Sequence, residues 1–214
     1  DGITKVTTPT LSGNAITSGG QVQILDGSTP LGTVTATGNS WSFTPSTGLS
    51  LSDGVHTITA RDVSENKTSS ALSLTVDTVA NAPVISAPAA NTKVAPVVAG
   101  TGAEAGATIT LTATAADGSS SQSFTTLANA SGAWSVDTGV TAGSNTALVA
   151  NKVYAFRATQ TDAAGNTSAA SAAQSVNYDT VVAVPTVNTV PASSASTLTL
   201  TGTGEVGAVV RVYD

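Results

Sequence analysis

Two stretches of this chain repeat one another at a separation of about one hundred residues, and this repeat constrains the fold more than any other feature. The stretch from Asp62 to Pro83 contains D-V-S-E-N-K-T-S, an alternating L-S-L-T-V and D-T-V-A-N-A-P. The stretch from Asp162 to Pro185 contains D-A-A-G-N-T-S-A, an alternating A-Q-S-V-N-Y and D-T-V-V-A-V-P. A repeat of this length indicates modules joined in a row rather than one catalytic body.

The repeat divides the chain into two modules and the beginning of a third. We place the first module at residues 1–79, the second at 80–181 and the N-terminal part of the third at 182–214. The third copy is evident because the segment 198–212 matches the segment 97–111. Roughly 30 residues do not bury a core of their own. We therefore expect this part either to belong to a longer module or to be completed by another chain.

The composition favours thin cores of small and β-branched residues. Aromatic residues make up 4% of the chain and charged residues 9%, both low for a globular protein. The chain has no cysteine, so no disulfide stabilises it. The formal net charge of −6 argues against a nucleic-acid partner, because phosphate binding needs a basic surface. No apolar run approaches the length of about 18 residues typical of a membrane-spanning helix, so we expect no membrane insertion.

Apolar and polar residues alternate in short runs, as they do in half-buried antiparallel strands. Val22 and Ile24, for example, share one face of such a run. Turn dipeptides such as Asp26–Gly27 separate the runs. The pattern predicts an all-β fold of tandem immunoglobulin-like, seven-stranded antiparallel β-sandwiches.

The number of strands follows from how a module joins its neighbours in an extended array. The chain must enter at one end and leave at the other, so the number of antiparallel strands is odd. The first module shows six strand-like runs: Pro9–Ser12, Gln21–Leu25, Gly32–Ala36, Ser40–Thr44, Val55–Arg61 and Leu72–Val76. We therefore predict a seventh short strand near Thr47–Leu51.

Several spaced motifs resemble the bacterial immunoglobulin-like repeats of large biofilm-associated and type I-secreted surface adhesins. These motifs are W-S-F-T-P, L-S-D-G-V-H-T-I-T-A, D-A-A-G-N-T-S and V-D-T-V-A-N-A-P. The resemblance implies a structural extension segment on the bacterial cell surface, with calcium bound between modules. It also implies that the partners are neighbouring modules of the same chain, and that other domains contact a host or matrix surface.

The chemical groups expected of an enzyme are scarce. One histidine and no cysteine exclude a cysteine-based or multi-histidine metal site. His56 lies six residues before Asp62, just as Phe156 lies six before Asp162, so we expect a semi-buried strand histidine. A lone sandwich offers no deep cleft in which two carboxylates face a substrate. We predict that the chain is not an enzyme.

Acidic residues near the first junction form a candidate metal site. Tracing the strand directions places Asp77, at the end of the first module, beside Asp162 and Asn166 in the second, with Asp117 as a further neighbour. Oxygen side chains that converge on a short linker suit Ca²⁺, which takes about six to eight oxygen ligands. A bound cation also relieves the repulsion between close carboxylates.

The same tracing places Asp179 and Glu104 at the opposite end of the second module, facing the third. An alternative interpretation is that Asp and Asn only form turns through local hydrogen bonds to the backbone. It is stronger for the following residues: Asp26, Asp53, Asp62, Asn66 and Asp137.

Trp41 and Trp134 bear on two other functions. Each alternates with an apolar residue, Phe43 or Val136, which favours a place in the core over exposed sugar stacking. A glycan- or protein-binding accessory module would need exposed aromatic residues, and few remain. A filament subunit joined by strand donation is suggested only by the incomplete third copy.

Overall fold

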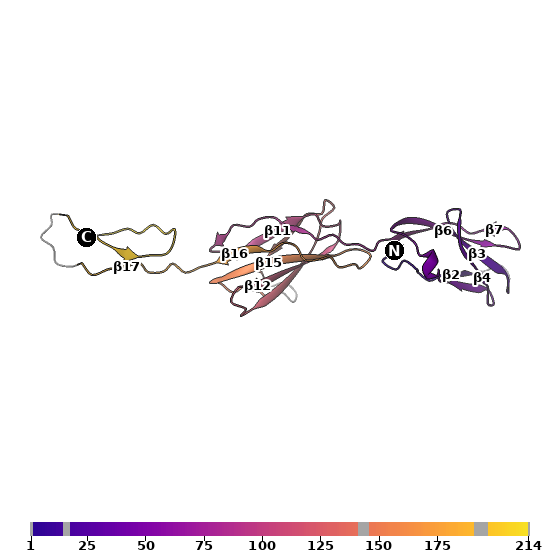
Figure 1. Cartoon of the computed structure of the whole chain (residues 1–214), viewed down its shortest axis with the longest axis horizontal. Coiled ribbons are helices and arrows are strands. Elements are labelled where there is room, and N and C mark those ends of the chain that lie inside the picture. The colour runs from indigo at the N-terminus through magenta and orange to yellow at the C-terminus, as the bar shows by residue number, and fades with distance from the viewer. Residues whose placement is uncertain (1, 15–17, 141–145, 191–196, 214) are drawn as a thin grey trace.

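The computed structural model describes residues 2–14, 18–140, 146–190 and 197–213 and shows an elongated chain (Figure 1). Two sheet-rich bodies follow one another along the long axis, and a thin C-terminal part extends beyond them. Apart from one 3₁₀ turn, η1 (Thr47–Leu49), the regular elements of the described residues are strands. None of these residues belongs to a helix with the length and apolarity needed to cross a membrane. The all-β prediction is confirmed.

The first sandwich contains two packed sheets. Its strands are β1 (Ile3–Thr4), β2 (Leu11–Asn14), β3 (Gln21–Asp26), β4 (Thr29–Thr35), β5 (Ser40–Phe43), β6 (Gly54–Asp62), β7 (Lys67–Thr68) and β8 (Leu72–Val76). The larger sheet has the order β1-β8-β6-β3-β4, with β7 added to β6, and the smaller sheet is β2-β5. Buried side chains from both sheets, including Leu11 and Ile24, form the core between them. The two apolar faces produced by the alternating pattern therefore pack together.

The prediction of a strand near Thr47–Leu51 is wrong. Residues Thr47–Leu49 form η1, and Leu51 is buried beyond it. The remaining strand is instead β1, at the N-terminal end of the module, where Ile3 pairs in parallel with Thr75. A strand of two residues has no alternation to recognise. With β7 as a short addition to β6, the main strands still number seven.

The second sandwich repeats this arrangement. Its strands are β9 (Val84–Ile85), β10 (Asn91–Thr92), β11 (Val97–Thr101), β12 (Thr108–Ala115), β13 (Ser121–Leu127), β14 (Trp134–Asp137), β15 (Lys152–Thr161) and β16 (Gln174–Tyr178). One sheet has the order β10-β16-β15-β12-β13 and the other β14-β11-β9. The first strand of the module is thus divided between the two sheets. Its β9 part pairs with β11, and its β10 part pairs in parallel with β16. β10 is the counterpart of β1, since both pair in parallel with the last strand.

The second core contains more buried aromatic side chains than the first. Phe124, Tyr154 and Phe156 are fully buried there, and Trp134 is 4% exposed. In the first module Trp41 is only partly buried and packs against the edge of the core. The prediction of a core tryptophan is therefore confirmed for Trp134, and Trp41 lies at the border.

In the C-terminal part, the described residues form one short antiparallel pair, β17 (Thr186–Val187) and β18 (Gly202–Thr203). Every residue from 182 to 213 that the structure describes is exposed. This part therefore has no core among its described residues, as its length predicts.

Candidate metal site at the module junction

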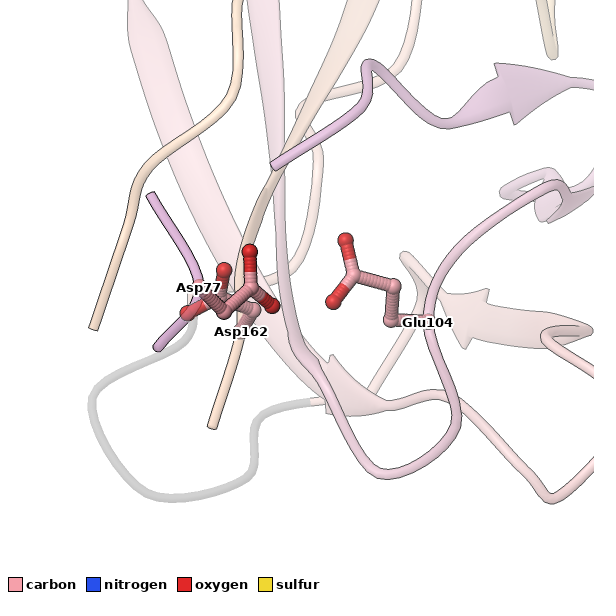
Figure 2. A group of neighbouring side chains, drawn as sticks. All are labelled: Asp77, Glu104 and Asp162. Carbon is pink, nitrogen blue, oxygen red and sulfur yellow. The ribbon is translucent and has the colours of Figure 1, made fainter. Parts of the chain in front are cut away.

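Three carboxylates meet where the first module joins the second. Asp77, Glu104 and Asp162 each present an oxygen within 4.8 Å of the other two (Figure 2). Figure 2 shows the carboxylates of Asp77 and Asp162 side by side, with that of Glu104 turned toward them. Asp162 is buried, and the other two are partly buried. The cluster brings together segments from both modules that lie far apart in the sequence.

Short loops at strand ends position these side chains. Asp77 follows β8, and its N–H donates a 2.9 Å hydrogen bond to the carbonyl of Thr4. Asp162 follows β15, where Thr161 pairs with Thr108 at the start of β12. Glu104 lies in the turn that leads from β11 into β12. The three carboxylates therefore belong to one end of the second sandwich.

Asn166 links the two modules through its side-chain nitrogen. Its Nδ2 donates 2.8 Å hydrogen bonds to the carbonyl oxygen of Asp77 and to Oδ2 of Asp162. Its backbone N–H donates to Oδ1 of Asp162 at 2.8 Å. Asn166 lies at the predicted junction, and in this arrangement it orients the carboxylate of Asp162 rather than offering an oxygen itself.

Lys5 makes a further contact between the modules. Its Nζ donates a 2.7 Å hydrogen bond to the carbonyl of Gly165, in the same loop as Asp162 and Asn166. Sequence reasoning missed this residue, because a lysine on an exposed loop carries no signal of its own. The sequence indicates that Lys5 has a role only through its repeat counterpart, Lys93. Lys5 directly follows β1 and Lys93 directly follows β10, the two strands that pair in parallel with the last strand of their module.

The negative charges of the cluster repel one another in a partly buried place. Burial, followed by the negative charges of Asp162 and Asp77, raises the pKa of Glu104 above its ordinary value. Hydrogen bonds from the N–H of Asn81 and from Gln160 oppose this rise without cancelling it. Gln160 is fully buried and binds Glu104 twice. Its Nε2 donates a 2.9 Å hydrogen bond to Oε1 of Glu104, and its own Oε1 accepts one from the backbone N–H of Glu104 at 2.8 Å. The negative charge is thus fixed in place and incompletely compensated.

Two predicted positions require correction. Glu104 lies beside Asp77 and not at the end that faces the third module. The prediction took β11 as the first strand of the module. β9 and β10 precede β11 along the chain, so the turn that carries Glu104 lies at the opposite end of the sandwich. For the same reason Asp117 lies at the other end of β12.

Asp117 has partners of its own. It accepts hydrogen bonds from Ser119 and from Nζ of Lys152, the latter at 2.9 Å. The hydroxyl of Ser119 and then the ammonium of Lys152 hold the pKa of Asp117 well below its usual range. Asp117 therefore forms a turn and an ion pair, as in the alternative interpretation.

Asp179 and Glu205 reproduce half of the cluster after the second module. The N–H of Asp179 donates to the carbonyl of Thr92 at 2.9 Å, as that of Asp77 does to Thr4. Oε2 of Glu205 accepts the N–H of Ala183 at 3.0 Å, as Glu104 accepts the N–H of Asn81. Sequence reasoning missed Glu205, although aligning G-T-G-E-V-G with the Glu104 turn identifies it.

The donor set fits a hard divalent cation. Carboxylate oxygens are the ligands that Ca²⁺ prefers, and the ion accepts irregular geometry with water or carbonyl oxygens at the remaining positions. Asp77, Glu104 and Asp162 would hold it. Burial, and then repulsion from Asp162 and Asp77, raises the pKa of Glu104, and a bound cation would offset that repulsion.

The structure thus contains two β-sandwiches of similar strand order that follow one another along the chain. A model of the family described as "Bacterial Ig-like domain" matches residues 1–78, so the first module is similar to that family. This match confirms the resemblance inferred from the motifs. Among curated protein sequences, none matches the chain.

Several solved structures resemble the chain in fold. The BSP domain of a biofilm associated protein is 18% identical over 84% of this chain and 29% of that chain, with a TM-score of 0.31. A Ca²⁺-stabilized adhesin that helps an Antarctic bacterium reach out and bind ice is 24% identical over 87% and 48%, with a TM-score of 0.39. Fibronectin(III)-like modules of Clostridium thermocellum CbhA are 12% identical over 83% and 88%, with a TM-score of 0.39. The chain thus spans less than half of each of the first two.

Proposed function

We propose that this chain is a non-catalytic extension segment, or stalk, of a bacterial cell-surface adhesin, with Ca²⁺ bound between its modules. In this role the segment is extracellular and holds a distal binding domain away from the cell, in support of adhesion and biofilm formation. Its direct partners are the neighbouring modules, whose boundaries we place at residues 79/80 and 181/182. The match of residues 1–78 to the family described as "Bacterial Ig-like domain" supports the immunoglobulin-like module on which this proposal rests.

The observation that carries the proposal is the convergence of Asp77, Glu104 and Asp162 within 4.8 Å. Asp77 belongs to the first module, whereas Glu104 and Asp162 belong to the second. A cation bound by all three therefore resists bending of the junction, because bending separates its ligands. The Lys5–Gly165 and Asn166–Asp77 hydrogen bonds also cross this junction and favour the same orientation.

The repeated contacts support an array in which each junction has the same design. Asp179 and Glu205 provide counterparts of Asp77 and Glu104. At the other end of the first module, Asp62 is the counterpart of Asp162, and its Oδ2 is buried with no hydrogen-bond partner among the described residues. A stalk built from such modules becomes a rod when every junction is fixed.

Small-angle scattering tests the proposal. We expect the chain to be longer and stiffer in Ca²⁺ than in chelator, because the ion fixes the angle between the modules. The comparison variant is Asp162→Asn, which removes one charge from the cluster and should need a higher Ca²⁺ concentration to produce the same change in profile. An unchanged profile for the unsubstituted chain would remove calcium from the proposal and leave only the stalk.

A further inference from the structure

The turn that carries Asp77 is held on both sides of this residue. The N–H of Asp77 donates a 2.9 Å hydrogen bond to the carbonyl of Thr4. One residue further, the N–H of Thr78 donates to Oδ1 of Asp53 at 3.1 Å, and its Oγ1 lies 2.9 Å from both carboxylate oxygens of Asp53. The N–H of Val79 then donates back to Oδ1 of Asp77 at 3.1 Å. The backbone is therefore fixed before and after the residue that the first module contributes to the cluster.

Strand pairing brings Asp53 to this turn. Asp53 directly precedes β6, and Gly54, the first residue of β6, pairs with Val76, the last residue of β8. In an antiparallel pair, the residues before the start of one strand lie beside those after the end of the other. Asp53 therefore lies beside the turn, 25 residues away from Thr78 in the sequence. Both residues are exposed, so their contact adds nothing to the core.

The second module repeats this arrangement with a different residue. Asn151 directly precedes β15, as Asp53 precedes β6. Its Oδ1 accepts the N–H of Thr180 at 2.9 Å and the hydroxyl of Thr180 at 3.1 Å. The N–H of Val181 donates to Oδ1 of Asp179 at 3.0 Å, so the turn has the same form as the first. The repeated D-T-V sequence thus has one set of contacts in both modules.

The difference between Asp53 and Asn151 shows what the contact requires. One side chain is a charged carboxylate and the other is a neutral amide, yet each accepts both the N–H and the hydroxyl of the following threonine. The shared feature is a side-chain oxygen at this position. A negative charge is therefore not needed to hold the turn.

We propose that Asp53 is a positioning residue of the junction: by holding Thr78 through its oxygens, it fixes the turn that presents the carboxylate of Asp77 to Glu104 and Asp162. This inference rests on the proposed function, because it concerns the same junction. Asp77 is the residue that the first module contributes to the three carboxylates. A ligand on a mobile turn must lose conformational entropy when it binds a cation, whereas a fixed turn has already lost it. Asp53 therefore raises the affinity for Ca²⁺ without contacting the ion.

Three variants separate positioning from a simple effect of charge. Asp53→Ala removes both the oxygens and the negative charge. Asp53→Asn removes the charge and keeps an oxygen, as Asn151 has in the second module. Asn151→Ala is the matched control, because it removes the same contact from the turn of Asp179, which is not one of the three clustered carboxylates.

Calorimetric titration of the full chain with Ca²⁺ tests the effect on the junction. We expect Asp53→Ala to weaken binding by about threefold to tenfold, which is the net effect of one typical hydrogen bond. Asp53→Asn and Asn151→Ala should stay within about twofold of the unsubstituted chain. Thermal melts in chelator check that all variants are folded, and the exposed position of Asp53 favours this.

Backbone ¹⁵N relaxation in chelator tests the turn without calcium. The order parameter of the Thr78 amide should be near the rigid value of about 0.85 in the unsubstituted chain and in Asp53→Asn, and should fall below about 0.6 in Asp53→Ala. Asn151→Ala should loosen Thr180 and leave Thr78 rigid. A residue that only stabilised the fold would not loosen this one amide selectively.

The outcomes distinguish this inference from the proposed function. Equal losses of affinity in Asp53→Ala and Asp53→Asn would assign the effect to charge and overturn the inference. A rigid Thr78 or an unchanged affinity in Asp53→Ala would also overturn it while leaving the calcium site in place. If the unsubstituted chain binds no Ca²⁺, the calcium part of the proposed function fails, and the order parameter of Thr78 decides whether Asp53 fixes the turn.

Discussion

The two tryptophans show how the same residue differs between repeats when its surroundings differ. Trp134 is covered by β9, which lies against the strand that carries Gly100. Trp41 has no such cover among the described residues and is only partly buried. An aromatic ring contributes to stability mainly through the apolar area that it removes from water, so the two should contribute unequally.

Trp134→Ala should destabilise the second module by about 3–5 kcal/mol, because it leaves a large cavity in a closed core. Trp41→Ala should cost clearly less in the first module. Urea denaturation of both variants measures the free energies of unfolding. Equal costs would contradict the difference in burial between the two rings.

His56 stands where the second module has the core residue Phe156, and it forms a partly buried hydrogen-bonded pair with Asp26. Its Nδ1 lies 2.7 Å from Oδ2 of Asp26, and its Nε2 lies 2.7 Å from the carbonyl of Ser52. The hydrogen bond with Asp26, followed by that with Ser52, raises the pKa of His56 above 6.5. Both ring nitrogens act as donors only in the protonated ring, so the site favours the imidazolium.

The raised pKa of His56 makes the stability of the first module depend on pH. A pKa that is raised in the folded state stabilises fully below the unfolded value of about 6.5, and this contribution is lost as the pH rises through the folded pKa. His56→Gln should therefore cost the first module more at pH 5 than at pH 9. Urea denaturation at both pH values measures it, and the second module, which has Phe156 here, is the internal control.

At the scale of strands and loops, the D-x-x-x-N loop shows how a repeat tolerates substitution. In the second module Gly165 takes a positive φ of 85°. In the first module Glu65 stands at this place, and the positive φ moves to Asn66, at 54°. Asn enters this region more easily than Glu does. The loop of the first module then uses other donors, since the N–H groups of Ser64 and Glu65 bind Oδ1 of Asp62 where that of Asn166 binds Oδ1 of Asp162.

Asp162 and Asp117 occupy opposite ends of β12 and β15 and should respond differently to substitution. Asp162→Asn should lower the affinity for Ca²⁺ by about tenfold or more, because it removes a buried charge from the cluster. Asp117→Asn should leave that affinity unchanged, since Asp117 pairs with Lys152. Calorimetric titration with Ca²⁺ measures both, and an equal loss would contradict the proposed ligand set.

At the scale of the whole molecule, the described residues form two separate cores joined by a short linker. The linker residues Val79–Ala82 end in Pro83, which restricts the residue before it to extended conformations. The junction therefore behaves as a hinge of limited range. Ligands on both sides of such a hinge couple the two modules.

Differential scanning calorimetry should resolve two transitions in chelator, one for each core. Ca²⁺ should raise the transition of the module that unfolds first, because it binds only while Asp77, Glu104 and Asp162 are together. A concentration one hundred times the dissociation constant adds about 2.7 kcal/mol. Identical traces with and without Ca²⁺ would contradict a site shared between modules.

The order of amino acids was sufficient for the fold class and for part of the junction. Alternation with period two defined the strands, and the strand directions traced through the repeat predicted that Asp77 and Asp162 meet. Both signals are local or periodic, and such signals survive without knowledge of the packing.

Three-dimensional packing was needed for the rest. Two-residue strands such as β1 and β9 exist only because a neighbouring strand offers hydrogen bonds, so nothing in their sequence marks them. A missed first strand reverses the direction assigned to the strands just after it, which is why Glu104 and Asp117 were expected at the wrong ends. The strand wrongly predicted near Thr47–Leu51 restored the assignment, so Asp162 was expected at the right one. The contact of Lys5 with Gly165 likewise arises from the orientation of the modules, which no single module encodes.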